Sequence, residues 1–146
     1  SAGSIMTPEF VDLKKDSTVE DAFKRIRRTG VDKETIYTCY VTDASRHLIG
    51  VTTVKELLLH NYDDKIEDFM ETNIIFVNTH DDKEIAANYF DKYNFLALPV
   101  VDMEERLVGI ITFDDAIDVL QEENTEDIHK MNAAYNRKAL FKNRNN

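Results

Sequence analysis

Between Thr112 and Asp127 the chain carries a dense group of acidic side chains and no basic one. The seven carboxylates are Asp114, Asp115, Asp118, Glu122, Glu123, Glu126 and Asp127. On a helix, Asp115, Asp118 and Glu122 fall at i, i+3 and i+7, where like charges destabilise an isolated helix by about 0.2–0.5 kcal/mol per pair. A divalent cation would remove that penalty, and hard oxygen ligands suit Mg²⁺. The segment therefore predicts either a Mg²⁺ site or a solvated acidic face.

The composition excludes several other kinds of protein. The formal net charge of -10 over 146 residues argues against a nucleic-acid grip spread over the whole surface. The longest uninterrupted apolar stretch, 95–101, contains Pro99 and is far shorter than the roughly 20 residues of a membrane-spanning helix. The single cysteine, Cys39, excludes an internal disulfide framework and is expected to be an inert core residue.

Catalytic motifs are missing from the sequence. It contains no Gly-rich phosphate loop, no His-x-x-x-His metal pair and no Gly-x-Ser-x-Gly elbow. The four histidines fall in predicted turns or helix ends, where a surface position is expected. We therefore do not expect an enzyme.

The charge is distributed unevenly along the chain. The segment 130–146 holds five basic residues and no acidic one. Such a stretch is typical of the cytoplasmic flank of a membrane helix. A solvated tail has the same composition, so both interpretations stay open.

An internal repeat organises the rest of the sequence. Asp43, Leu48, Gly50 and Thr53 recur 59 residues later, as Asp102, Leu107, Gly109 and Thr112. Upstream, Met6 recurs as Met70, and 19–22 matches 83–86, at an offset of 64 residues. Two copies of one unit of roughly 55 residues explain these matches.

Each unit is predicted to follow the order β-α-β-β-α. Apolar periodicity, β-branched runs and an N-cap at 16–18 predict the elements. In the first unit these are strands 10–13, 36–42 and 48–53, a helix from 19 and a helix at 54–60. In the second they are strands 74–77, 96–101 and 107–112, a helix at 81–93 and a helix from Phe113. Because the second strand pair is apolar without alternation, both of its faces should be buried, one by helices and one by the sister repeat.

The two units resemble CBS domains. The residues that carry the resemblance are Gly109-Ile-Ile-Thr-Phe-Asp-Asp-Ala116, preceded by Ala97-Leu-Pro-Val-Val-Asp102. The segments Ala2-Gly-Ser-Ile-Met-Thr-Pro8 and Thr125-Glu-Asp-Ile-His-Lys130 are similar to the MgtE magnesium transporter family. The resemblance implies an α/β (α+β) fold of tandem CBS domains packed through their sheets, followed by a connecting ("plug") helix that leads into the membrane.

This resemblance divides the chain as follows: CBS domain 1 at 1–60, a linker at 61–68, CBS domain 2 at 69–121, and the plug helix with its basic tail at 122–146. It also implies a homodimer. The parent protein would have an N-terminal helical domain and a transmembrane pore, and this fragment would lie at the cytoplasmic face of the cell membrane. No nucleic-acid partner is implied.

The resemblance further implies that Mg²⁺ is sensed where the second CBS domain meets the plug helix. The positions that match are Asp115, Asp118, Glu123, Glu126 and Asp127. Asp82 and Glu84, at the start of a predicted helix, are weaker candidates, because acidic residues are ordinary at a helix N-terminus. Thr125 is expected to cap a further helix.

A different class of function is an adenine-nucleotide sensor. In many CBS pairs a Thr or Ser followed three residues later by Asp holds the ribose and phosphate of ATP or AMP. Thr112 and Asp115 match that pattern, and Thr53 and Glu56 match it with Glu in place of Asp. Phe95 could stack on the base or pack in the core. Both hypotheses thus assign a role to Asp115. The third hypothesis is a purely structural dimerisation module.

Overall fold

The computed structural model describes residues 1–93 and 95–130, with side chains through residue 122. The first repeat comprises β1 (Val11–Lys14), α1 (Val19–Thr29), β2 (Thr38–Thr42), β3 (Leu48–Thr53) and α2 (Val54–Leu59). The second comprises β4 (Val77–Asn78), α3 (Lys83–Tyr93), β5 (Ala97–Val101), β6 (Leu107–Thr112) and α4 (Phe113–Lys130). Short 3₁₀ turns lie at Ala2–Ser4 (η1), Gly30–Asp32 (η2) and Ile66–Asp68 (η3). The predicted order β-α-β-β-α, twice, is confirmed.

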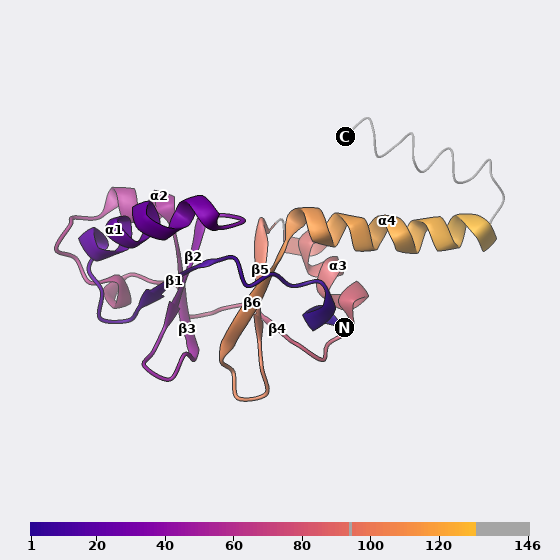
Figure 1. Ribbon diagram of the computed structural model, residues 1–146, viewed down its shortest axis with the longest axis horizontal. Helices are drawn as coiled ribbons and strands as arrows, with labels where there is room; N and C mark the ends of the chain where they lie inside the picture. Colours follow the sequence, from indigo (N-terminus) through magenta and orange to yellow (C-terminus); the bar gives the residue numbers. More distant parts are fainter. Residues whose placement is uncertain (94, 131–146) are drawn as a thin grey trace.

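Each repeat builds one three-stranded sheet of the same topology. The strand orders are β1-β2-β3 and β4-β5-β6, the first pair of each parallel and the second antiparallel. Both hairpins shift register at the same place, between Val41 and Thr42 and between Val100 and Val101. The helices lie along one side of the molecule and the hairpin loops project from the other (Figure 1). The repeat read from the sequence is therefore a structural repeat.

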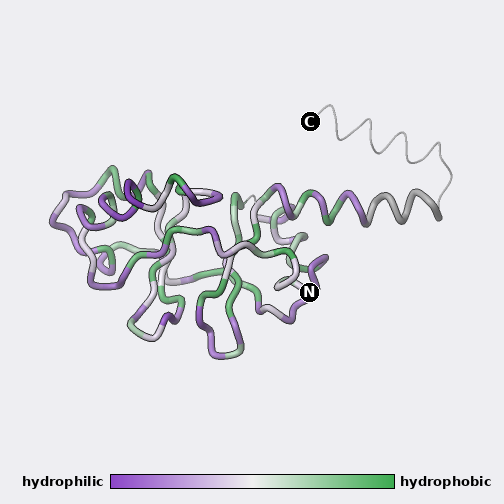
Figure 2. The backbone as a smooth tube through the Cα atoms, viewed as in Figure 1, coloured by the Kyte–Doolittle hydropathy of each residue, from purple (hydrophilic) through white to green (hydrophobic). Residues whose placement is uncertain are grey.

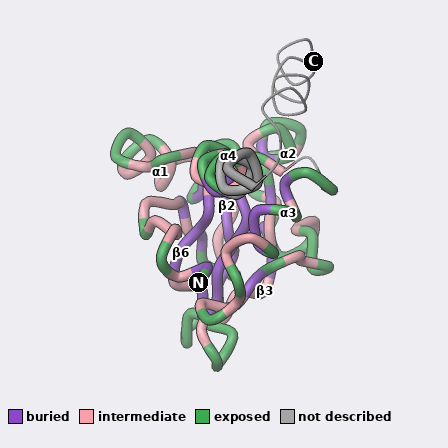
Figure 3. The backbone as a smooth tube through the Cα atoms, turned by 90° about the vertical axis from the view of Figure 1, so that its right-hand side faces the viewer, coloured by how far each residue is buried: buried purple, intermediate pink, exposed green. Residues whose placement is uncertain are grey.

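Apolar residues are buried on both faces of the sheets. One cluster lies between the first sheet and its helices, and a second between the second sheet and α3 and α4. The third joins the sheets through Tyr40, Ala97, Leu107 and Ile110. Figure 2 shows the apolar residues running along the strands, and Figure 3 shows buried strands at the centre of the molecule. The expectation that helices cover one face of the second hairpin and the sister repeat the other is confirmed.

The two repeats are interlocked by the segments that precede their first strands. Ala2 is buried in the cluster of the second repeat, and its N–H donates to the Asp81 carbonyl oxygen over 2.6 Å. Thr7 bridges Ile110 on β6, and Glu71 bridges Val51 on β3 in the equivalent way. The segment that precedes the first strand of each repeat thus pairs with the last strand of the other repeat's sheet. The N-terminus consequently lies beside α3 and β4 (Figure 1).

Two local predictions were wrong. The strand expected at 74–77 is formed only at Val77–Asn78, because Ile74 and Ile75 line a cleft between the repeats instead of pairing. Thr125 does not begin a new helix, since α4 runs without a break from Phe113 to Lys130. No Gly or Pro interrupts that stretch, so nothing in its sequence ends the helix there. The basic tail, 131–146, lies outside the described residues.

Candidate functional site

The acidic helix α4 begins with a side-chain cap. Thr112 Oγ1 accepts the N–H of Asp115 over 3.4 Å and donates to its Oδ2 over 3.1 Å. The first bond is an N-cap contact, which satisfies one N–H of the first turn, and the second ties the Asp115 carboxylate to the capping hydroxyl. It fixes the Asp115 carboxylate at the start of α4. The Thr-x-x-Asp spacing therefore has a structural role here, whatever else it does.

Beside this turn lies an open hollow of about 390 Å³. It is formed by the N-terminal segment, the first turn of α3 and one face of α4. Its lining residues are Ser4, Ile5, Met6, Lys83, Asp115, Asp118, Val119 and Glu122. Three carboxylates from successive turns of α4 thus face one hollow, with a single ammonium opposite them. We call this the acidic hollow.

The acidic hollow suits a hydrated cation better than a stripped one. Among the residues whose side chains the structure describes, no three His, Cys, Asp or Glu side chains converge closely enough to enclose a metal ion. Mg²⁺ keeps several of its waters and takes only one or two carboxylates directly. The spacing of Asp115, Asp118 and Glu122 along α4 is compatible with a hydrated ion held partly through water.

The other predicted metal residues lie at two places. Glu123, Glu126 and Asp127 fall on the later turns of α4, beyond the described side chains. Asp82 and Glu84 flank Lys83 but do not line the hollow. A hydrogen bond between these two carboxyls lowers the pKa of Asp82 and raises that of Glu84. The Glu84 N–H also donates to Asp82 over 2.9 Å, so the pair is occupied with local capping of α3.

A second candidate site is a cleft of about 310 Å³ between the repeats. It is lined by Thr38, Tyr40, Val51 and Thr53 from the first repeat, by Phe95, Leu96, Ala97, Leu98 and Pro99 from the second, and by Glu71, Asn73, Ile74 and Ile75 from the segment between them. The volume lies at the lower end of the range for small-molecule sites. We call this the inter-repeat cleft.

One polar group of the inter-repeat cleft lacks a partner among the residues that the structure describes. Tyr40 is fully buried, and its hydroxyl forms no hydrogen bond with any of them. Burial raises the pKa of Tyr40, so the phenol stays protonated and able to donate. Buried polar groups are nearly always hydrogen-bonded, because an unpaired one costs free energy. The oxygen is covered by protein, so a ligand in the cleft would pair with it only after a local rearrangement of the lining residues.

The structure separates the two hypotheses that shared Asp115. Thr53 and Phe95 line the inter-repeat cleft, whereas Asp115 lines the acidic hollow. Phe95 packs against Phe90 at 6.4 Å between ring centroids, as expected of a core residue, and it also borders the cleft. Its stacking on a base stays a prediction. Thr53 Oγ1 accepts the Glu56 N–H over 3.1 Å as the cap of α2. Neither Glu56 nor Thr112 is among the residues that line the cleft.

Two polar site residues, Tyr40 and Lys83, were not predicted from the sequence. Glu122 was expected on the helical face of Asp115 and Asp118, although it was not among the positions that the family resemblance implied. Tyr40 lies in an apolar strand, and only the three-dimensional packing shows that its hydroxyl lacks a partner. Cys39 next to it is buried as expected, and burial raises the pKa of its thiol to about 12.

The family model described as "CBS domain" matches residues 2–62 and 66–122. The chain belongs to the CBS domain family, as a tandem pair. Both matched segments coincide with the structural repeats described above. No helix within the described residues is long and apolar enough to cross a membrane.

Three relatives that are 37–43% identical to the chain are magnesium transporters. The chain is 43% identical over 132 residues to the magnesium transporter MgtE of Thermus thermophilus, a match that covers 90% of this chain and 29% of that protein. A crystal structure of the soluble part of a magnesium transporter superimposes with a TM-score of 0.82 at 40% identity, over 84% of this chain and 48% of that one. The cytosolic domain of the Mg²⁺ channel MgtE in complex with ATP superimposes with a TM-score of 0.78 at 41% identity, over 81% and 48%. The pair therefore spans less than a third of the transporter's length, and these relatives are transporters rather than enzymes.

Proposed function

We propose that this CBS pair is the cytosolic regulatory part of an MgtE-like magnesium transporter and that it senses Mg²⁺ at the acidic hollow. The observation that carries the proposal is the composition of that hollow. Asp115, Asp118 and Glu122 face it from α4, while Lys83 and the N-terminal segment face it from the other side. A cation bound there would tie the start of α4 to the body of the domain.

The mechanism we propose is electrostatic. Without Mg²⁺ the carboxylates of α4 repel one another and any acidic surface brought close to them. Bound Mg²⁺ replaces that repulsion with bridging and favours the compact arrangement. A ligand shifts such an equilibrium only by its different affinities for the two states. α4 continues beyond the body of the domain (Figure 1). A change in the position of α4 would therefore carry the effect of Mg²⁺ binding to an attached pore.

The proposal includes partners outside this chain's structure. A second copy would pair with it as a homodimer. An N-terminal helical domain and a transmembrane pore would belong to the same parent protein, so that the CBS pair lies at the cytoplasmic face of the membrane. Glu123, Glu126 and Asp127 stay proposed Mg²⁺ residues, contributed by the later turns of α4, and Asp82 and Glu84 stay weaker ones.

The experiment that tests Mg²⁺ sensing compares two charge-matched variants. Asp118→Asn with Glu122→Gln removes two carboxylates from the acidic hollow. Asp63→Asn with Glu67→Gln removes two exposed carboxylates from the first repeat, far from it. We expect Mg²⁺ to raise the melting temperature of the natural chain and of the second variant, and to raise that of the first variant much less. Equal Mg²⁺ responses of the two variants would contradict the proposal.

A second candidate function is adenine-nucleotide sensing in the inter-repeat cleft. The unpartnered hydroxyl of Tyr40 and the presence of Thr53 and Phe95 in one cleft favour it. The MgtE cytosolic domain that holds ATP gives independent support. ATP or AMP should raise the melting temperature without Mg²⁺, and Phe95→Leu should weaken that response more than Phe113→Leu, which alters a half-exposed ring outside the cleft. A nucleotide response that is lost to the same extent in the Phe95 and the Phe113 variants would contradict a site in this cleft.

A further inference from the structure

A groove runs along α1 on the side of the first sheet away from the second repeat. Its lining residues are Asp12, Leu13, Lys14, Ser17, Asp21, Lys24, Arg25 and Arg28, and its volume is about 250 Å³. β1 is the edge strand of its sheet. Because the Leu13 side chain is buried in the core, the main chain of β1 is what it presents to the groove. The groove thus combines an open strand edge with one face of a helix.

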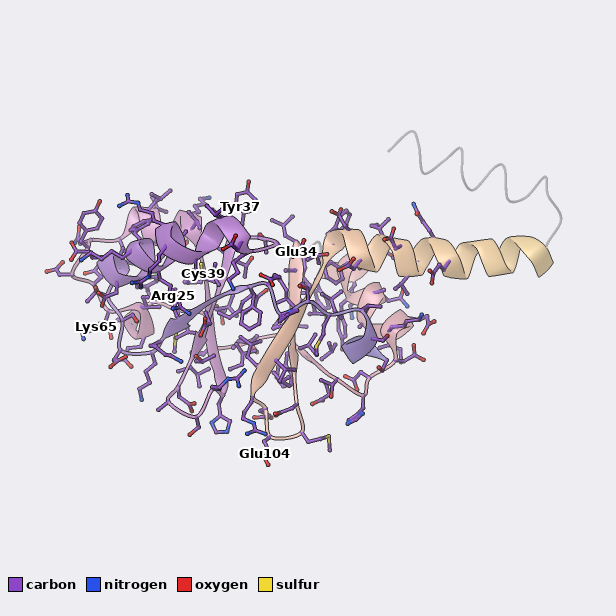
Figure 4. All side chains as sticks on the ribbon, in the orientation of Figure 1. Arg25, Glu34, Tyr37, Cys39, Lys65 and Glu104 are labelled. Atoms are coloured by element: carbon purple, nitrogen blue, oxygen red, sulfur yellow. The ribbon has the colours of Figure 1, made fainter. Side chains whose placement is uncertain are left out.

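The groove is basic in an acidic protein. Four of its residues are cationic and two are acidic, whereas the chain as a whole carries -10. Both acidic side chains already have local donors: Arg25, labelled in Figure 4, reaches Asp12 over 2.9 Å, and the Thr18 N–H donates to Asp21 over 3.0 Å. Lys24 pairs with Glu20 over 3.6 Å and Lys14 with Asp12 over 3.9 Å, but both lysines are exposed, so the pairs are weak. Arg28 has no ion-pair partner within the described part of the chain. Cationic charge is therefore left over.

The second repeat shows that the fold does not need these charges. At the offset of 64 residues, Asp12, Asp21 and Arg25 correspond to Phe76, Ile85 and Tyr89. α3 takes the place of α1 there, although β4 is shorter than β1. Two of these positions carry exposed apolar side chains, with Phe76 38% and Ile85 59% exposed, whereas Lys24 and Arg28 correspond to Asn88 and Lys92. Since the helix forms with either set, folding does not require Asp12, Asp21 and Arg25 at these positions, and the polar face of α1 is open to a role in binding.

We propose that this groove binds an extended, acidic peptide segment of a partner protein, which adds as a further strand to β1. An exposed strand edge offers main-chain hydrogen bonds to such a peptide, and side chains beside it select the sequence. Lys24 and Arg28 are one helical turn apart, about 6 Å along the axis. Alternate residues of a strand are about 6.6 Å apart. Carboxylates at every second position therefore match the two cations in spacing as well as in sign.

The test uses a fluorescein-labelled ten-residue peptide that alternates glutamate and threonine, titrated with the full chain and followed by fluorescence anisotropy. We expect saturable binding that weakens with salt. Lys24→Gln with Arg28→Gln should weaken it at least tenfold. Lys92→Gln, which changes the position equivalent to Arg28 in the second repeat, should leave it within twofold. All three positions are on helix surfaces, and circular dichroism will show whether the variants stay folded.

Hydrogen exchange then reports how the peptide binds. The amides of β1 should gain protection when the peptide is bound, because new main-chain hydrogen bonds form at its edge. Equal affinity of the Lys24/Arg28 variant, or binding without protection of β1, would overturn the proposal. Absence of peptide binding would also overturn it, including the outcome in which vesicles containing phosphatidylglycerol bind to the basic groove instead.

Discussion

Tyr40→Phe tests whether the unpartnered hydroxyl in the inter-repeat cleft is held for a ligand. The side chain is fully buried, and its hydroxyl has no hydrogen bond to any residue whose side chain the structure describes. A buried, unpaired polar group costs about 1–3 kcal/mol, and Phe keeps the ring while removing the oxygen. The ring also keeps its edge-to-face contact with Phe10 at 6.1 Å. We therefore expect the unliganded variant to be more stable than the natural chain by about 1 kcal/mol.

Urea denaturation measures this directly. With a slope of roughly 2 kcal/mol per molar, typical of small proteins, a gain of about 1 kcal/mol raises the midpoint by about 0.5 M at unchanged slope. Tyr37→Phe is the matched control, because Tyr37 is 65% exposed and its hydroxyl can bind water; its midpoint should not move. ATP should stabilise the natural chain more than the Tyr40 variant. A Tyr40 variant that is less stable by 1 kcal/mol or more without ligand would refute the reasoning, since the hydroxyl would then have a partner in the free protein.

Three further predictions concern the charges and the caps. Lys83→Gln removes the ammonium that faces the acidic hollow, so Mg²⁺ affinity measured by calorimetry should rise by roughly fivefold, about 1 kcal/mol of Coulomb repulsion in water-like surroundings; an unchanged affinity would place Mg²⁺ elsewhere. Thr53→Ala removes the cap of α2 and should lower stability by about 1 kcal/mol, whereas a change below the error of urea denaturation would mean that the cap is replaced by water. A hydrogen bond from the backbone N–H of His47 holds the pKa of Asp43 below its ordinary value. The ionised Asp43 carboxylate therefore adds to the free energy of unfolding above about pH 4, and this contribution is lost as the pH falls through the lowered pKa. Asp43→Asn should make stability depend less steeply on pH in acid, and an unchanged pH dependence would contradict the assignment.

The repeated fold could be predicted from the sequence because the residues that recur are the ones that form its strands, turns and helix caps. Leu48 to Thr53 and Leu107 to Thr112 form strands with the bounds that their β-branched runs indicated. The N-cap expected at 16–18 forms at Thr18, with its capping box. These features are local, so periodicity and capping chemistry are enough to find them.

The misses arise where contacts between distant segments decide the outcome. Ile74 and Ile75 have the composition of a strand, but the packing of the two repeats places them in the cleft wall. Asp115 matched two motifs, and only the packing of α4 against the N-terminal segment shows that it faces the acidic hollow. The N-terminal segment itself, Ser4 to Met6, was not expected at a site, because its place depends on the exchange of entry segments between the repeats.

The most direct test of Mg²⁺ sensing follows the backbone amide chemical shifts of the chain by NMR while MgCl₂ is added, with NaCl of matched ionic strength as the control. We expect saturable shifts at Asp115, Asp118 and Glu122, at Lys83 and in the N-terminal segment, which NaCl does not reproduce. Small, diffuse shifts that NaCl reproduces would contradict it and would leave the acidic face of α4 as a solvated surface.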